Sequence, residues 1–282
     1  MDVATVTAPS GGLLSAIRGT LADADEALLC VAFAQRRGVH LITKELETVA
    51  KRCGTRVLVT TTFGATSGAA LDALHGIGAT VRVLNPAGGT YHPKVFLGRS
   101  GATLQAVVGS GNLTSGLVAN VEVGTYLRGH QTDGALATLW SWADETWRDA
   151  RSVPWTPHAD DADSEEQIDP ELLALIQSRV RAEPRLYTLG PMPKPNLVRE
   201  ATPSGLWVET ERSRAAKKPA QFIPPHMLNL AWDVLKSRGE LSNRELLDEL
   251  RVHRSSFVCA MLAKVPGVEV VSSRPVLLRY RP

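Results

Sequence analysis

The sequence predicts an α/β protein with a large mixed sheet flanked by helices and a second, smaller α+β domain near the C-terminus. The chain of 282 residues is long enough for two domains at roughly 100–200 residues each. Short apolar runs alternate with helix-length segments through the first half, as in a sheet covered by helices. The last 57 residues instead predict helices followed by a hairpin.

Strands and helices alternate at the beginning of the chain. The apolar runs at 26–34, 56–62 and 80–85 predict strands, and the segments 41–53 and 67–78 predict helices between them. This βαβαβ order favours parallel strands.

The pattern changes beyond residue 85. The runs 95–98 and 104–109 flank the turn-rich residues 99–103, which predicts an antiparallel hairpin. One more strand is predicted at 121–128, and a helix with three tryptophans at 135–150. The sheet is therefore expected to be mixed.

Composition separates the chain into three parts. An acidic stretch at 158–171 predicts a linker, a helix follows at 170–183, and residues 184–225 are rich in proline and basic residues without a recognisable fold. We therefore expect a first domain at residues 1–155 and a second domain at residues 226–282. Between them, residues 156–225 would form an acidic linker, a helix and a connector rich in proline and basic residues.

The C-terminal segment has the order of a winged helix-turn-helix. A helix at 227–239 ends at a glycine, Ser242 and Glu245 form a capping box for a second helix, and a third helix is predicted at 255–265. Two strands within 268–280 complete the pattern. In such a domain the third helix enters the major groove of DNA and the hairpin contacts an adjacent groove or backbone.

Basic charge is concentrated in the same third of the chain. Residues 184–282 carry 16 Lys and Arg against 9 Asp and Glu, whereas residues 1–150 carry 12 of each. A localised basic excess suits binding to phosphate backbones, although a solvated basic surface has the same charge. A winged helix can also be used for dimerisation or as a rigid spacer. The residues expected to contact DNA are Arg254, Ser255, Ser256, Arg274, Lys217 and Lys218.

Composition also excludes several classes of protein. With 44% hydrophobic and 21% charged residues the chain is neither disordered nor fibrous. Its longest apolar run, at 27–34, is far below the roughly 18 residues of a membrane span, and no export signal is visible. Three separated cysteines predict neither a disulfide framework nor a metal site. We therefore expect a cytoplasmic protein without a membrane contact, metal or cofactor.

Groups suited to phosphate chemistry gather in the middle of the sequence. His92 and Lys94 are two apart on a predicted strand, so their side chains should leave the same face of the sheet. Ser110 and Asn112 lie in a glycine-flanked loop after the next strand, and Glu122 begins another. A histidine can attack phosphorus, Lys and Asn can hold the non-bridging oxygens, Ser can support the loop, and Glu can orient a histidine.

This pattern resembles the phospholipase D superfamily, whose motif is H-x-K followed by G-S-x-N. The match is His92-Pro93-Lys94 and the segment 109–112, and the resemblance covers roughly residues 13–150. Arg99 stands where the family usually has Asp, and the gap before Gly-Ser is longer. The resemblance implies a covalent, metal-free phosphodiesterase whose catalytic residues are His92, Lys94, Ser110, Asn112 and Glu122.

The sequence holds one copy of the motif, because no other histidine begins an H-x-K. Since the family builds its active site from two facing motifs, the resemblance implies a homodimer with one shared site. One His92 would form a phosphohistidine while the second protonates the leaving oxygen, so the pair shares a proton and should give a bell-shaped pH profile.

Together these observations favour an endonuclease that acts on double-stranded DNA, with a restriction or phage-defence role by analogy with family members that join such a domain to a DNA-reading domain. A lipid phosphodiesterase is an alternative, but it should have paired motifs and a membrane-docking segment. A DNA-binding regulator that uses the first domain only to dimerise is another, but its motif should be damaged.

Overall fold

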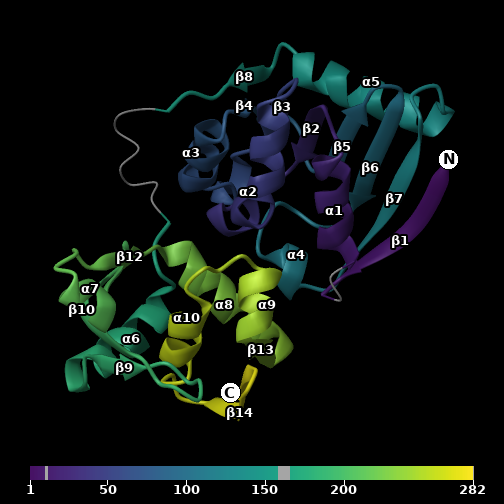
Figure 1. The fold of residues 1–282 in the computed structure, drawn as a ribbon. Coiled ribbons are helices and arrows are strands. Elements are labelled where there is room, and N and C mark those ends of the chain that lie inside the picture. The colour runs from purple at the N-terminus through teal and green to yellow at the C-terminus, as the bar shows by residue number, and fades with distance from the viewer. Residues whose placement is uncertain (10–11, 158–165, 282) are drawn as a thin grey trace. The chain divides into compact units, whose positions relative to one another are not determined.

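The computed structural model describes residues 1–9, 12–157 and 166–281 (Figure 1). The chain divides into two compact units, Met1–Glu165 and Glu166–Pro282, and each has its own sheets. The expected class is confirmed, because the first unit contains a large mixed sheet flanked by helices and the second is a smaller α+β unit.

One eight-stranded sheet forms the first unit, in the order β1-β7-β6-β5-β2-β3-β4-β8. Its strands are β1 (Asp2–Ala8), β2 (Glu26–Val31), β3 (Thr55–Val59), β4 (Thr80–Leu84), β5 (Lys94–Ser100), β6 (Thr103–Gly109), β7 (Glu122–His130) and β8 (Ser152–Pro154). Its helices are α1 (Gly12–Ala22), α2 (Arg36–Ala50), η1 (Thr62–Gly64), α3 (Gly68–Gly76), α4 (Gly116–Ala119) and α5 (Gly134–Arg148). The pairs β2–β3 and β3–β4 are parallel, as the βαβαβ pattern predicts, and the other neighbours are antiparallel.

Helices cover both faces of this sheet (Figure 1). On one face, Leu28 and Leu97 belong to a buried cluster that includes Leu136 and Trp147 of α5. On the other face α1 lies so close that a Cβ on Gly98 would be 2.3 Å from the carbonyl oxygen of Thr20. The central strand β2 is therefore almost wholly buried, which explains its continuous apolar sequence.

Both edge strands, β1 and β8, were missed by the sequence analysis. β1 pairs only with β7, and most of its side chains are exposed. β8 has three residues. Neither strand buries one complete face, so neither has the one-sided hydrophobic pattern by which a strand is recognised.

A partly buried ion-pair network connects the sheet to α5. Arg56 on β3 donates to Glu26 at 2.7 Å and to Asp144 of α5 at 2.6 Å. Arg99 also pairs with Glu26 and lies over the ring of Trp140, 4.8 Å from its centroid. Arg99 thus has a structural role far along β5 from Lys94.

The second unit contains two antiparallel sheets. Its strands are β9 (Arg185–Tyr187), β10 (Pro195–Thr202), β11 (Gly205–Thr210), β12 (Gln221–Ile223), β13 (Glu240–Ser242), β14 (Val268–Ser273) and β15 (Val276–Tyr280). Its helices are α6 (Pro170–Ala182), α7 (Glu211–Ala215), α8 (Pro225–Arg238), α9 (Asn243–Asp248) and α10 (Ser255–Leu262). The sheet orders are β12-β11-β10-β9 and β13-β15-β14.

Residues 184–225, which the sequence left as a connector, form the four-stranded sheet of this unit. Its inner face buries Leu186, Val198, Leu206 and Ile223. The strands are short, and the pairing of β10 with β11 shifts register between Val198 and Glu200. These interruptions and the many prolines hide the alternation of the strands in the sequence. The acidic stretch predicted as a linker falls mostly on residues 158–165, outside the described ranges.

The C-terminal elements follow the expected order, with one added strand. α8 ends at Gly239, whose φ of 75° is the left-handed conformation of a helix C-cap. The Ser242 hydroxyl accepts from the Glu245 backbone N–H at 3.1 Å and begins α9. The Glu245 carboxylate pairs with Arg238, so the predicted capping box is only half formed. β13, between α8 and α9, pairs with β15.

Gly38, near the start of α2, should tolerate no side chain. A Cβ there would lie 2.1 Å from the carbonyl oxygen of Leu113. We expect Gly38→Ala to lower the free energy of unfolding of the first unit by about 1–3 kcal/mol, as overpacking does. Urea unfolding of the full chain followed by far-UV circular dichroism measures the change.

The matched control is Gly19→Ala in α1. Gly19 is exposed, and a Cβ there meets nothing within 4 Å. Since alanine is the better helix former, this variant should be about 0.5–1 kcal/mol more stable than the wild type. Equal stability of Gly38→Ala and the wild type would contradict the close approach of α2 to Leu113.

Candidate active site

Three loops meet just beyond the end of β2. The backbone N–H of Ala32 donates to the carbonyl of Pro93 at 2.8 Å. Leu113 N–H donates to the Phe33 carbonyl at 3.1 Å, and Gln35 N–H donates to the Leu113 carbonyl at 2.9 Å. The loop that carries His92 and the loop that carries Ser110 and Asn112 are thus bonded to the same short segment.

His92 and Lys94 are in direct contact. The Lys94 Nζ lies 2.7 Å from Nδ1 and 3.0 Å from Nε2 of His92, and it also donates to the His92 carbonyl at 3.0 Å. Lys94 is the first residue of β5, whereas His92 precedes the strand, so the expectation that both lie on a strand is wrong. The His92 side chain is exposed and the Lys94 side chain is buried.

Burial changes the titration of Lys94. Desolvation lowers the pKa of its ammonium, and the negative charge of Glu122 opposes this by raising it. The two residues are therefore electrostatically coupled although they lie on different strands.

Glu122 holds the serine of the loop. The Ser110 hydroxyl donates to one Glu122 carboxylate oxygen, and the Asn120 amide donates to the other at 3.1 Å. The Ser110 hydroxyl also accepts from the Val123 backbone N–H at 3.1 Å. The sequence analysis expected Glu122 to orient a histidine, whereas in this chain its carboxylate accepts from Ser110 and Asn120.

Phe33 lies between the two halves of the motif. Its backbone N–H donates to Oδ1 of Asn112 at 3.3 Å. Its ring packs edge-on against the His92 imidazole, with centroids 5.6 Å apart and planes at 73°. Phe33 was missed by the sequence analysis because it reads as one more apolar residue of the predicted strand 26–34, and Asn120 was missed because it stands outside the motif.

Gly109 allows β6 and β7 to approach at the beginning of the loop. A Cβ on Gly109 would lie 2.4 Å from the Val123 carbonyl oxygen and 2.6 Å from the Gly124 Cα. The glycine before Ser110 is therefore required by close backbone packing. It keeps Ser110 beside Glu122 at the end of the strand.

The residues expected to contact DNA differ in how exposed their side chains are. Lys217, Lys218 and Arg274 are exposed, the last in the tight connection between β14 and β15. Ser255 is only 5% exposed, so it presents nothing to a DNA groove in this conformation. Ser256 is exposed.

The third helix of the C-terminal segment is covered. In α10, whose eight residues are all described, every residue except Ser256 is buried. The helix contacts β9, and Arg254 at its N-cap donates to the Gln221 side chain of β12 at 2.6 Å. The four-stranded sheet therefore lies against the helix that the sequence assigns to the major groove.

Two further findings concern the described residues as a group. They include no cluster of three or more His, Cys, Asp or Glu side chains placed to hold a metal ion. None of their helices is both long enough and apolar enough to cross a membrane.

Comparison with protein-family models and with curated protein sequences gives no match. Among solved structures, the chain is similar to Nuc from Salmonella typhimurium, a phospholipase D family member, at 16% identity and a TM-score of 0.45, over 55% of this chain and 99% of that one. NucT from Helicobacter pylori is 13% identical with a TM-score of 0.43, over 55% of this chain and 99% of that one. Yeast tyrosyl-DNA phosphodiesterase is 8% identical with a TM-score of 0.32, over 44% of this chain and 32% of that one.

The coupling between Glu122 and Lys94 predicts a titration shift. Removing the Glu122 charge with Glu122→Gln removes the attraction that raises the pKa of Lys94. The pKa of Lys94 should therefore be below that of an exposed lysine in the wild type and lower still in the variant. NMR titration of ¹³C-labelled lysine side chains measures both values.

Glu145→Gln is the control, because Glu145 is an exposed carboxylate of α5 in the same unit. It should leave the Lys94 titration unchanged. A higher pKa of Lys94 in Glu122→Gln would show that the assigned direction of the coupling is wrong.

Proposed function

We propose that this protein is a metal-independent endodeoxyribonuclease that hydrolyses DNA phosphodiesters through a phosphohistidine at His92. The observation that carries the proposal is the exposed imidazole of His92 in contact with the buried ammonium of Lys94. A lysine ammonium only donates hydrogen bonds, and both ring nitrogens lie within reach of it, so a neutral imidazole can accept from Lys94 through its unprotonated nitrogen. This is the form of histidine that acts as a nucleophile.

The reaction has two displacements. In the first, a neutral His92 nitrogen attacks phosphorus, a P–N bond forms, and the bond from phosphorus to the leaving sugar oxygen breaks as that oxygen takes a proton. In the second, water attacks phosphorus, the P–N bond breaks, and the water proton passes to the group that donated in the first step. The products are a phosphate monoester and a free hydroxyl.

Neighbouring groups stabilise the charge that develops on the phosphate. Lys94 supplies a cation whose burial strengthens its attraction for the non-bridging oxygens. The Asn112 Oδ1 accepts from the Phe33 backbone N–H, which leaves the Nδ2–H groups of Asn112 as donors for a phosphate. The hydrogen bond from the Ser110 hydroxyl to the Glu122 carboxylate joins the two ends of the segment that carries Asn112.

The proton donor is His92 of a second copy, which completes the site in a homodimer. The chain has one H-x-K motif, so it supplies only one of the two imidazoles that the reaction needs. The surface beside the site supports such an interface, because Val121 is 91% exposed and Val123 is 55% exposed on either side of Glu122. These two exposed apolar side chains are available to pack against a partner surface beside the site.

The second unit supplies contact with double-stranded DNA in this proposal. Its C-terminal elements have the order of a winged helix, but α10 is buried except at Ser256 and contacts α8, α9 and β9. The exposed cations Lys217, Lys218 and Arg274 are therefore the groups available for the DNA backbone. A nuclease site joined to a separate DNA-binding unit suits a restriction or phage-defence enzyme.

Cleavage of supercoiled plasmid in EDTA tests the chemistry. The wild type should cleave, and His92→Ala should lower the rate at least about 1,000-fold because the nucleophile is lost. His130→Ala is the control, since His130 is an exposed histidine at the end of β7. Cleavage that depends on added metal, or an active His92→Ala, would refute the proposed mechanism.

A shared site predicts the order of products. One site per dimer cuts one strand at a time, so nicked circles should precede linear DNA at limiting enzyme. Wild-type protein mixed with an excess of His92→Ala should lose activity beyond simple dilution, because mixed dimers lack one imidazole. Linear DNA without a nicked intermediate would contradict the single shared site.

A further inference from the structure

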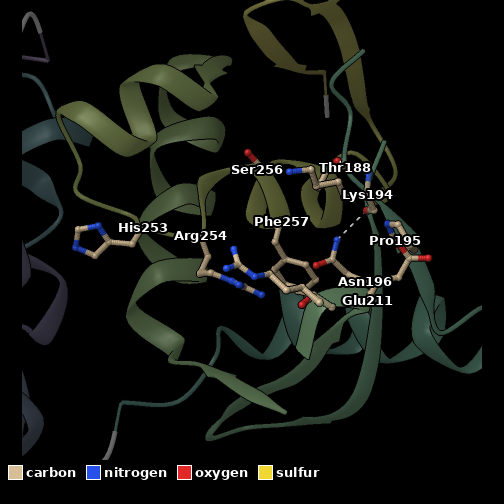
Figure 2. A pocket seen from close by; sticks show the side chains of 11 residues that line it. Thr188, Lys194, Pro195, Asn196, Glu211, His253, Arg254, Ser256 and Phe257 are labelled. Carbon is tan, nitrogen blue, oxygen red and sulfur yellow. Dashed lines mark hydrogen bonds between the residues drawn. The ribbon is translucent and has the colours of Figure 1, made fainter. Parts of the chain in front are cut away.

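A cavity of about 430 Å³ lies inside the second unit, between the N-terminus of α10 and the four-stranded sheet (Figure 2). Its walls come from the start of β10, the β11–α7 junction and residues 253–257. This volume falls within the roughly 300–1,000 Å³ that is usual for small-molecule sites. The proposed nuclease mechanism uses none of these residues.

The charge of the lining favours an anion. Lys194, Arg212 and Arg254 are its cationic residues, and Glu211 is its one carboxylate. Three cations against one carboxylate leave an excess of positive charge in a partly enclosed space. Such a space attracts a phosphate group more strongly than open solvent does.

Arg254 is the group best placed to bind that phosphate. Its Nη1 donates to the Gln221 side chain at 2.6 Å, whereas Nε and Nη2 are buried and have no hydrogen-bond partner. Burial lowers the pKa of the guanidinium. Nε and Nη2 form the edge that binds two oxygens of one phosphate side by side. A turn of the flexible side chain toward the cavity would present this edge and relieve both unpaired donors.

The same cavity has an apolar wall. Phe257 and Pro195 line it, and Figure 2 shows the Phe257 ring beside Arg254. The Asn196 amide donates to the Lys194 carbonyl at 3.0 Å and holds the chain at the rim. Phe257 is only 3% exposed and Pro195 is half-buried, so a planar ring would pack on the wall that the two residues make together while a phosphate meets the guanidinium. A nucleotide combines both features in one unit.

A second hollow adjoins the first and shares Thr188, Lys194 and Ser256 with it. Its lining includes Arg244 and Arg274 and no carboxylate. A basic groove that continues from the cavity can hold further phosphates of one strand. This continuity favours a nucleotide that belongs to a nucleic acid over a free one.

We propose that the cavity beside Arg254 binds one nucleotide of a DNA strand, turned out of its stack, with the phosphate on Arg254 and the base against Phe257. The chain would then sense an unpaired or weakly paired position, since such a base costs least to extrude. This site goes beyond the proposed nuclease chemistry, because it lies wholly in the second unit.

Direct binding to the full chain carrying His92→Ala tests this without cleavage. The probes are inorganic phosphate, the four deoxynucleoside monophosphates, and a labelled duplex with or without one mismatch, followed by calorimetry and fluorescence anisotropy. We expect the mismatched duplex to bind at least tenfold more tightly than the paired one. Arg254→Lys, which keeps the charge but loses the two-donor edge, should remove this preference.

Arg281→Lys is the matched control, since Arg281 is an exposed arginine outside the cavity lining, and it should change affinity less than twofold. Arg212→Ala, at an exposed position of the lining, provides a second variant if Arg254→Lys does not fold. If a free monophosphate binds tightly and the two duplexes bind equally, the ligand of the cavity is a free nucleotide and the proposed binding of a DNA strand is wrong. Equal binding of both duplexes and no binding of monophosphates would overturn the site. Neither result bears on cleavage by His92.

Discussion

The backbone hydrogen bonds just beyond β2 are the constraint on which the candidate active site depends. The segment that leaves this buried strand bonds to Pro93 on one side and to Leu113 on the other. These bonds join main-chain groups, so they position His92 and Asn112 whatever the conformations of those two side chains. A site held in this way needs little reorganisation when charge develops on a substrate.

The sheet also keeps one cation out of water. Lys94 pairs with Val31 at the end of β2, so its stem starts inside the sheet and its ammonium ends beside His92. Burying a charge is unfavourable, and the lowered pKa of Lys94 expresses that cost. The charge of Glu122 offsets part of it. The same burial makes Lys94 a stronger partner for a phosphate than an exposed lysine.

Tertiary packing changes what the C-terminal sequence means. The three helices and the final two strands there were correctly predicted, because glycine ends, serine caps and apolar periodicity are local signals, whereas β13 was missed. The exposure of α10 was not correctly predicted, because it depends on the sheet formed by residues 184–225. Ser255 is buried, and Arg254 donates a hydrogen bond to Gln221 of that sheet. Arg254 therefore lines a partly enclosed cavity where the sequence suggested an open DNA-reading surface.

The sequence by itself determined the mixed α/β class, the βαβαβ core and the residues of the motif. Each of these follows from the types of residue and their spacing along the chain, which are local properties. The structure alone decided which groups meet. In the folded chain Ser110 donates a hydrogen bond to Glu122, and Phe33 contacts both His92 and Asn112. Arg99 forms an ion pair with Glu26. These contacts join residues distant in the chain, and only the folded sheet, with its fixed strand order and register, brings them together.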